Sequence, residues 1–205
     1  MSLSRNNIKG ITLIETLVSL SLLSFAIAGP MTLAAHSIKV SGAVRNELIA
    51  THFAEEGLEV VHNLRDNLSA DDASGIGTDW MGTALAKLFE NCDTAFGCVI
   101  DITKHSGTNV WDYAAVIIEC AAGSCPSDIY INPLTGFYRQ SGSAPVSPWA
   151  RTGFKRTILM TGADNAANPR RQVRVTATVT YPGYGGIPRT IRVTQDVYNW
   201  FPQLP

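Results

Sequence analysis

The stretch Lys9-Gly10-Ile11-Thr12-Leu13-Ile14-Glu15 decides the organisation of this chain, because a short basic leader ends there and a long apolar run begins. The run from 11 to 35 spans 25 residues and carries one formal charge, that of Glu15. A membrane-spanning helix needs about 20 apolar residues, so the run is long enough to cross a bilayer. A carboxylate inside it costs roughly 2.5–3.5 kcal/mol on insertion scales, which predicts a function and a specific partner for Glu15.

The order of these residues resembles the processing site of type IV prepilins, in which a basic residue, Gly and an apolar residue precede Thr-Leu-Ile-Glu. The resemblance implies that a membrane peptidase cuts between Gly10 and Ile11 and that the new N-terminus at Ile11 is methylated. Glu15 is then the fifth residue of the mature chain. Ile11 stands where Phe is commonest in the family, but the apolar character of the position is kept.

Cleavage at this position supplies a partner for Glu15. It turns the amide nitrogen of Ile11 into an α-amine with a pKa of about 8, which is mostly cationic at neutral pH. A matched pair of charges in a medium of low dielectric constant costs much less than an isolated charge. We therefore expect the Ile11 amine of one subunit to pair with Glu15 of a neighbour, which would couple assembly to processing.

Two simpler interpretations of the N-terminus compete with this one. A secretory signal peptide also has a basic start and an apolar core, and Ala26-Ile27-Ala28 has the small residues of a cleavage site. A plain single-span anchor fits the length of the run. Neither interpretation gives a reason for Gly10 or Glu15, so the prepilin interpretation is favoured.

The pattern of apolar residues divides the chain into four segments. We expect a leader at 1–10, a transmembrane or filament-core helix at 11–36, an amphipathic continuation of the helix at 37–70, and a β-rich globular head at 71–205. The basic leader is expected to stay in the cytoplasm, with the C-terminal part exported. In the third segment apolar residues recur every three or four positions, which predicts a stripe on one helical face. Its members are Val40, Val44, Leu48, Thr51, Ala54, Leu58, Val61, Leu64 and Leu68, widened by Ile49, Phe53 and Val60.

Gly29-Pro30 interrupts the apolar run, because Pro30 cannot donate a hydrogen bond to the carbonyl of Ala26. Membrane helices tolerate a simple kink of this kind. An unwound turn that lets neighbouring helices pack is the alternative, and the sequence does not favour either.

The last third of the chain carries the clearest strand signal. Val173, Val175, Ala177, Val179 and Tyr181 alternate with Arg and Thr, which indicates a half-buried strand. The segment 182–186 then predicts a turn into a paired strand that runs to Trp200. Further candidate strands lie at 99–103, 113–119, 129–132, 137–140 and 154–160. The expected fold class is α+β, with a long N-terminal helix packed on a C-terminal antiparallel sheet, as the pilin resemblance also implies.

The four cysteines occur as two close pairs, Cys92 with Cys98 and Cys120 with Cys125. Their spacings are not those of zinc sites, and disulfides persist in the oxidising space outside the cytoplasm. Four cysteines allow three connectivities. We favour the two local pairs, since each closes a tight loop and would stabilise by about 2 kcal/mol in the loop-entropy model.

Composition and motifs argue against several classes of function. The net charge of −1 gives no electrostatic reason to expect nucleic acid as a partner. Glu59-x-x-His62 has the spacing of a di-iron motif, but no second such motif is visible, so we expect a solvated helical face. Asp71, Asp72 and Asp79 lack the spacing of a calcium loop. Without a nucleophile motif or phosphate loop, we expect neither an enzyme nor a cofactor or metal.

Later features resemble a subgroup, the PilV-like minor pilins or pilus-modification proteins. They are Phe154-Lys155-Arg156-Thr157-Ile158, the alternating strand 173–181, the ending Tyr198-Asn199-Trp200, and the run from Ala54-Glu55-Glu56 to Asn67. The resemblance implies a minor pilin in or at the tip of an extracellular filament, with a prepilin peptidase and methylase, other pilin subunits and the cytoplasmic membrane as partners. A pseudopilin of a type II secretion or DNA-uptake machine, and a membrane-anchored β-rich binding protein, remain alternatives.

Overall fold

The computed structural model describes residues 12–71, 92, 95–101, 103, 117–121, 125–140, 146–162 and 172–198, without the side chains of 67–71. Gly10, Ile11, Asp72 and Asp79 lie outside these ranges. So do most of the segment 71–77, whose composition predicts a linker, and 80–90, where the sequence predicts a short helix. The chain forms two compact units, Met1–Ala43 and Val44–Pro205.

A single helix, α1 (Leu13–Asp71), accounts for 59 residues. The long helix expected from the apolar periodicity is therefore confirmed, and it ends at Asp71, next to the expected boundary at 70. Pro30 lies inside α1 and does not end it, so the unwound turn considered for Gly29-Pro30 is not present here. Every residue from Thr12 to Gly42 is exposed on the single chain.

The described strands are all antiparallel to their neighbours. They are β1 (Cys98–Ile100), β2 (Ile117–Glu119), β3 (Asp128–Ile131), β4 (Tyr138–Gln140), β5 (Ala150–Gly162), β6 (Gln172–Pro182) and β7 (Pro188–Tyr198). The part of the expected strand 113–119 before Ile117 lies outside the described ranges. The α+β class expected from the sequence is confirmed.

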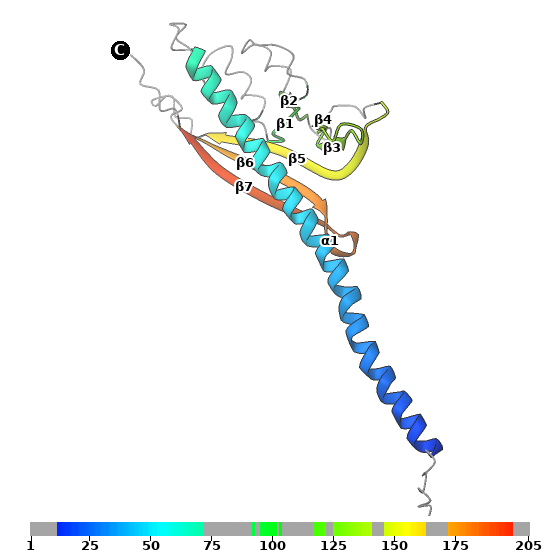
Figure 1. The fold of residues 1–205 in the computed structure, drawn as a ribbon. Coiled ribbons are helices and arrows are strands. Elements are labelled where there is room, and N and C mark those ends of the chain that lie inside the picture. Colours follow the sequence, from blue (N-terminus) through cyan, green and yellow to red (C-terminus); the bar gives the residue numbers. More distant parts are fainter. Residues whose placement is uncertain are drawn as a thin grey trace, which may run out of the picture. The chain divides into compact units, whose positions relative to one another are not determined.

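Strand β5 is the centre of the sheet. It pairs with β6 from Lys155 to Gly162, and β6 pairs in turn with β7 along the whole length of both strands. The first half of β5 pairs with β3 and its second half with β1, through Cys98 and Ile158. The sheet is strongly curled at β5 (Figure 1). Because β5 contacts three strands, its inward-facing side chains reach most of the head.

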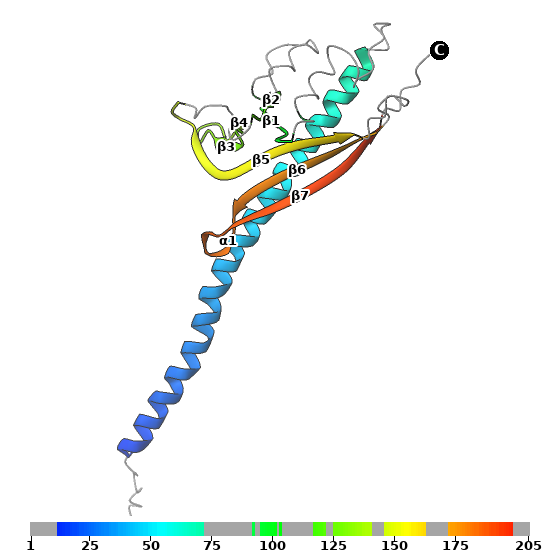
Figure 2. The same ribbon diagram turned by 180° about the vertical axis from the view of Figure 1, so that it is seen from behind.

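From Val44 onward, α1 lies across one face of the β5–β6–β7 sheet, which is seen in front of the helix in the view from behind (Figure 2). The core between them contains the residues expected from the alternation of β6, including Val173, Ala177 and Tyr181. From the helix it takes Ala50, Phe53, Ala54, Leu58, Val61 and Leu64.

The predicted helical stripe is wrong at its N-terminal end. Val44 and Leu48 are both 58% exposed, whereas Ala50 and Phe53 are buried. At 3.6 residues per turn, Leu48 lies on the opposite side of the helix from Ala50. The spacing of three or four residues fits both faces over a short stretch, and contact with the sheet selects the face that carries Phe53.

Gly57 lets the helix approach the sheet closely. A Cβ atom at this position would lie 3.1 Å from Ile158 Cδ1 and 3.3 Å from Arg156 Cδ, which is tighter than an ordinary contact. One turn away, the ring of Phe53 packs edge-on against Tyr138 and Phe154 at centroid distances of 5.0 and 5.5 Å. The glycine and the aromatic cluster therefore set the spacing between α1 and β5.

Candidate functional site

The first turn of α1 places Glu15 in a helix-capping arrangement. Thr12 precedes the first helical residue, and the backbone N–H of Glu15 donates to both the carbonyl and the Oγ1 of Thr12, at 3.0 and 3.4 Å. A Thr followed three residues later by Glu is the capping-box pattern, and a carboxylate also interacts favourably with the positive end of the helix dipole. This role was not predicted from the sequence, although the Thr-x-x-Glu spacing signals it.

The hydroxyl groups of the apolar segment are satisfied by the helix itself. Five of them donate to carbonyl oxygens three or four residues earlier, at 2.7–2.8 Å, as intrahelical bonds do. These bonds join Thr16 to Leu13, Ser19 to Glu15, Ser21 to Val18, Ser24 to Leu20 and Thr32 to Gly29. These bonds reduce the free-energy cost of placing the hydroxyl groups in lipid. Glu15 is the one charged side chain between Thr12 and Ala35, and it remains the polar group that is costly to bury there.

The head contains a buried cation, Arg156, which the sequence analysis did not single out. It is 4% exposed and lies in the inward-facing row of β5 between Phe154 and Ile158. The period-2 alternation of this strand could have identified it, because an arginine between two buried apolar positions must itself be buried.

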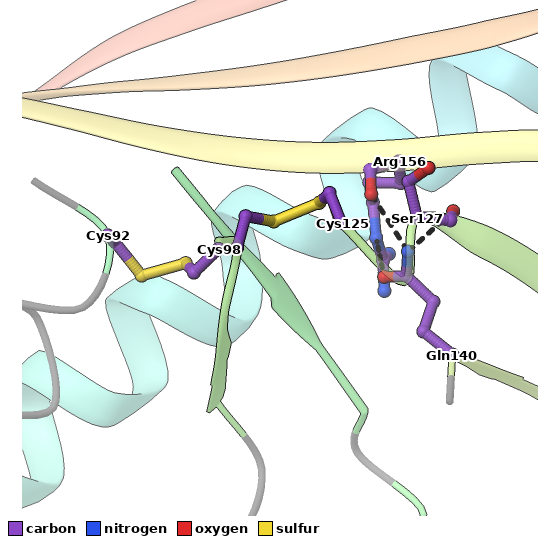
Figure 3. The surroundings of a disulfide bond; sticks show 7 residues. Cys92, Cys98, Cys125, Ser127, Gln140 and Arg156 are labelled. Carbon is purple, nitrogen blue, oxygen red and sulfur yellow. Dashed lines mark hydrogen bonds between the residues drawn. A yellow bond between two sulfur atoms is a disulfide. The ribbon is translucent and has the colours of Figure 1, made fainter. Parts of the chain in front are cut away.

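Arg156 joins the helix to three strands. Its Nη1 donates to the carbonyl oxygen of Phe53 in α1 at 3.0 Å, and its Nη2 to that of Ile100 at the end of β1 at 3.1 Å. Its Nε donates to Gln140 Oε1 in β4 at 3.0 Å. The amide of Gln140 in turn donates to the backbone oxygens of Ser127 and Arg156 at 2.9 and 2.8 Å (Figure 3).

Two carboxylates balance the charge of Arg156. Glu56 Oε1 lies 3.5 Å from its Nη1, and Asp101 is also buried. Burial lowers the pKa of the Arg156 guanidinium, while Glu56 and then Asp101 act in the opposite direction. An arginine nevertheless stays protonated in proteins, so the cluster is a buried and hydrogen-bonded ionic group.

The helical acids and histidines do not form a metal site. Glu56 faces Arg156, and His52 Nδ1 lies 3.4 Å from Glu55 Oε2 on the exposed face. Among the described residues no group of three His, Cys, Asp or Glu side chains is placed to hold a metal ion. The Glu59-x-x-His62 spacing therefore brings no further ligand with it in this part of the chain.

Two disulfides lie beside the buried cluster. The structure joins Cys92 to Cys98, at the start of β1, and Cys120 to Cys125 (Figure 3). Before Cys98, Gly97 has a φ of +69°, and a Cβ there would collide with the carbonyl oxygen of Ile158. The first disulfide therefore holds a segment whose backbone lies close against β5, where β1 pairs with it.

We expect peptide mapping of the non-reduced protein to recover Cys92 linked to Cys98 and Cys120 linked to Cys125. Each pair has its Cα atoms within 4.6 Å, inside the range that a disulfide spans. The measurement is mass spectrometry of protease-cut protein with free thiols blocked beforehand. Recovery of a Cys92–Cys120 link, or of alkylated cysteines, would contradict the local pairing.

Comparison with protein-family models finds a match to the prokaryotic N-terminal methylation motif at residues 5–29. The match covers the second half of the leader and the apolar segment as far as Gly29, including Gly10, Ile11 and Glu15, and it supports a type IV pilin-like precursor. By length and composition, α1 is able to cross a membrane. Comparison with curated proteins and with solved structures finds no match.

Proposed function

We propose that this chain is a minor pilin of a type IV pilus. In this proposal, residues 1–10 are a leader that a prepilin peptidase removes, and 11–36 anchor the precursor in the cytoplasmic membrane and later lie in the filament core. Residues 37–70 continue the helix and 71–205 form an exported head. The minor-pilin assignment is supported by segments 154–158 and 173–181, which resemble the PilV-like minor pilins. These segments lie in the strands β5 and β6.

The observation that carries the proposal is the position of Glu15 in the first turn of an exposed apolar helix, inside a matched methylation motif. The intrahelical bonds of the neighbouring hydroxyls leave this carboxylate as the only charge of the segment between Thr12 and Ala35. An isolated charge of this kind calls for an opposite charge at the same depth. A methylated Ile11 amine of a neighbouring subunit would supply it.

Replacing Gly10 with valine is expected to block processing of the chain. A glycine has no side chain, so a peptidase can approach the backbone on both sides of the scissile bond. The variant protein should accumulate as a precursor ten residues longer than the mature form, as measured by the mass of the membrane-extracted protein.

Ile11→Phe is the matched control for Gly10→Val, because it alters the adjacent residue to the one commonest in the prepilin family. It should be processed as the unaltered chain is. Mature protein of normal mass from the Gly10→Val variant would contradict processing at this position.

A further inference from the structure

The turn between β6 and β7 exposes apolar side chains. In this turn, defined here as residues 183–187, Ile187 is 68% and Tyr184 is 43% exposed. The turn is closed by a hydrogen bond from the N–H of Gly183 to the carbonyl of Ile187, at 2.9 Å. It therefore presents an isoleucine and a tyrosine on a fixed backbone, and an exposed apolar surface on a rigid support indicates a contact.

A hydrogen bond from helix α1 fixes the position of this turn within the head. Asn46 Nδ2 donates to the carbonyl oxygen of Pro182, the last residue of β6, at 2.9 Å. Asn46 lies two residues after Val44, at which this compact unit begins. The turn therefore lies beside the first residues of the unit.

Cationic side chains accompany the turn. Arg189 follows it on β7 and is exposed, and its Cγ would lie 2.8 Å from a Cβ on Gly183, so its stem crosses the turn. Arg45 is exposed beside Asn46, while Glu47 is the one acidic neighbour in sequence. A tyrosine and an isoleucine flanked by arginines match the interface of a membrane, where aromatic rings lie at headgroup level and arginines meet phosphate.

The connectivity of the chain keeps the turn near the expected membrane segment. Ten residues separate Asn46 from residue 36, where the expected membrane-spanning segment ends. Ten helical residues rise about 15 Å, so the chain itself limits how far Asn46, and the turn bonded to it, can lie from the end of that segment. The headgroup layer that borders the hydrocarbon core is therefore within reach of the turn.

We infer that the β6–β7 turn is a membrane-surface contact that rests on anionic phospholipid headgroups while the chain is anchored. This inference rests on the proposed function, because it requires the apolar segment to span the bilayer. The contact holds the head in one orientation on the membrane before the chain enters a filament, and it must be released on assembly.

Site-specific photocrosslinking of the full-length chain tests the contact. A benzophenone amino acid replaces Ile187 in one variant and Tyr198 in the other, and each protein is reconstituted in nanodiscs that contain an alkyne-tagged phosphatidylglycerol. Tyr198 is the matched control, because it is 53% exposed at the far end of β7, about 35 Å from the turn. We expect at least tenfold more lipid adduct at position 187 than at 198, and a severalfold loss when Arg45→Gln and Arg189→Gln are added.

Retention in the nanodisc is measured separately, so that the two proposals fail differently. A chain that leaves the disc in alkaline carbonate overturns the membrane-anchored precursor and the surface contact together. A retained chain with equal adduct at 187 and 198, or with adduct to a second copy of the chain in place of lipid, overturns the surface contact alone. The intact-protein mass confirms the disulfides in each variant, so a misfolded head is recognised.

Discussion

Replacing Glu15 with leucine is expected to lower the amount of this chain in sheared filaments at least tenfold, while processed protein in the membrane stays at its normal level. The substitution removes a charge that is costly in lipid, so insertion is unharmed. It leaves the Ile11 amine of a neighbouring subunit without a partner, and an unpaired buried charge costs about 3–5 kcal/mol. A free-energy difference of about 1.4 kcal/mol changes an equilibrium constant tenfold. Part of this cost is therefore enough to lower the ratio of filament protein to membrane protein measurably in a quantitative immunoblot.

The capping arrangement at Thr12 makes Glu15→Gln the decisive control. Glutamine also serves at the third position of a capping box, so this variant keeps the helix start and loses only the charge. It should assemble as poorly as Glu15→Leu, and Glu15→Lys should be worse because two cations would then face each other. Normal assembly of Glu15→Gln would show that the residue acts through the helix start. Normal assembly of Glu15→Leu would show that a pair between the Ile11 amine and the Glu15 carboxylate is not needed for assembly.

Replacing Arg156 with methionine is expected to lower the free energy of unfolding of the head by about 3–5 kcal/mol, because one partner of a buried ionic cluster is removed. The carbonyls of Phe53 and Ile100 and the amide oxygen of Gln140 each lose their donor from Arg156. Buried groups that lose a partner cost about 1–3 kcal/mol each, although such costs are not additive. Urea unfolding of the detergent-solubilised chain, followed by tryptophan fluorescence, measures the change.

Lys155→Met is the matched control for Arg156→Met. It removes a cation from the adjacent position of β5, where the side chain is exposed, and surface substitutions of this kind stay within about 0.5 kcal/mol. Arg156→Lys should recover only part of the loss, because an ammonium cannot reproduce the planar donor geometry of a guanidinium. A loss below 1 kcal/mol for Arg156→Met would show that the cluster does not hold α1 to the sheet.

Regular periodicity made α1 and β6 predictable from the sequence. The alternation from Val173 to Tyr181 gave the buried face of β6 correctly, because a strand has only two faces and a one-residue error would reverse them. A helix offers more choices, so Val44 and Leu48 were placed on the predicted stripe although the sheet contacts the side that carries Ala50 and Phe53. Apolar residues on that side are present in the sequence, but the contact with β5 is what determines which side of the helix is buried.

The buried cluster was the least predictable part of the head. Arg156, Gln140 and Asp101 come from separate strands or their ends, and no local pattern relates one to another. The alternation of β5 indicates that Arg156 points inward, but its acceptors on α1 and β1 lie 103 and 56 residues away. The capping role of Thr12 was predictable, by contrast, because all of its atoms lie within four residues.

The mass of the N-terminal peptide of the mature protein tests the central claim most directly. The protein is extracted from membranes of the cells that make it, digested, and analysed for the first residue and its modification. We expect a chain that starts at Ile11 with one methyl group on its α-amine. A chain that starts at Met1, or at Gly29 after signal-peptide cleavage behind Ala28, would contradict it.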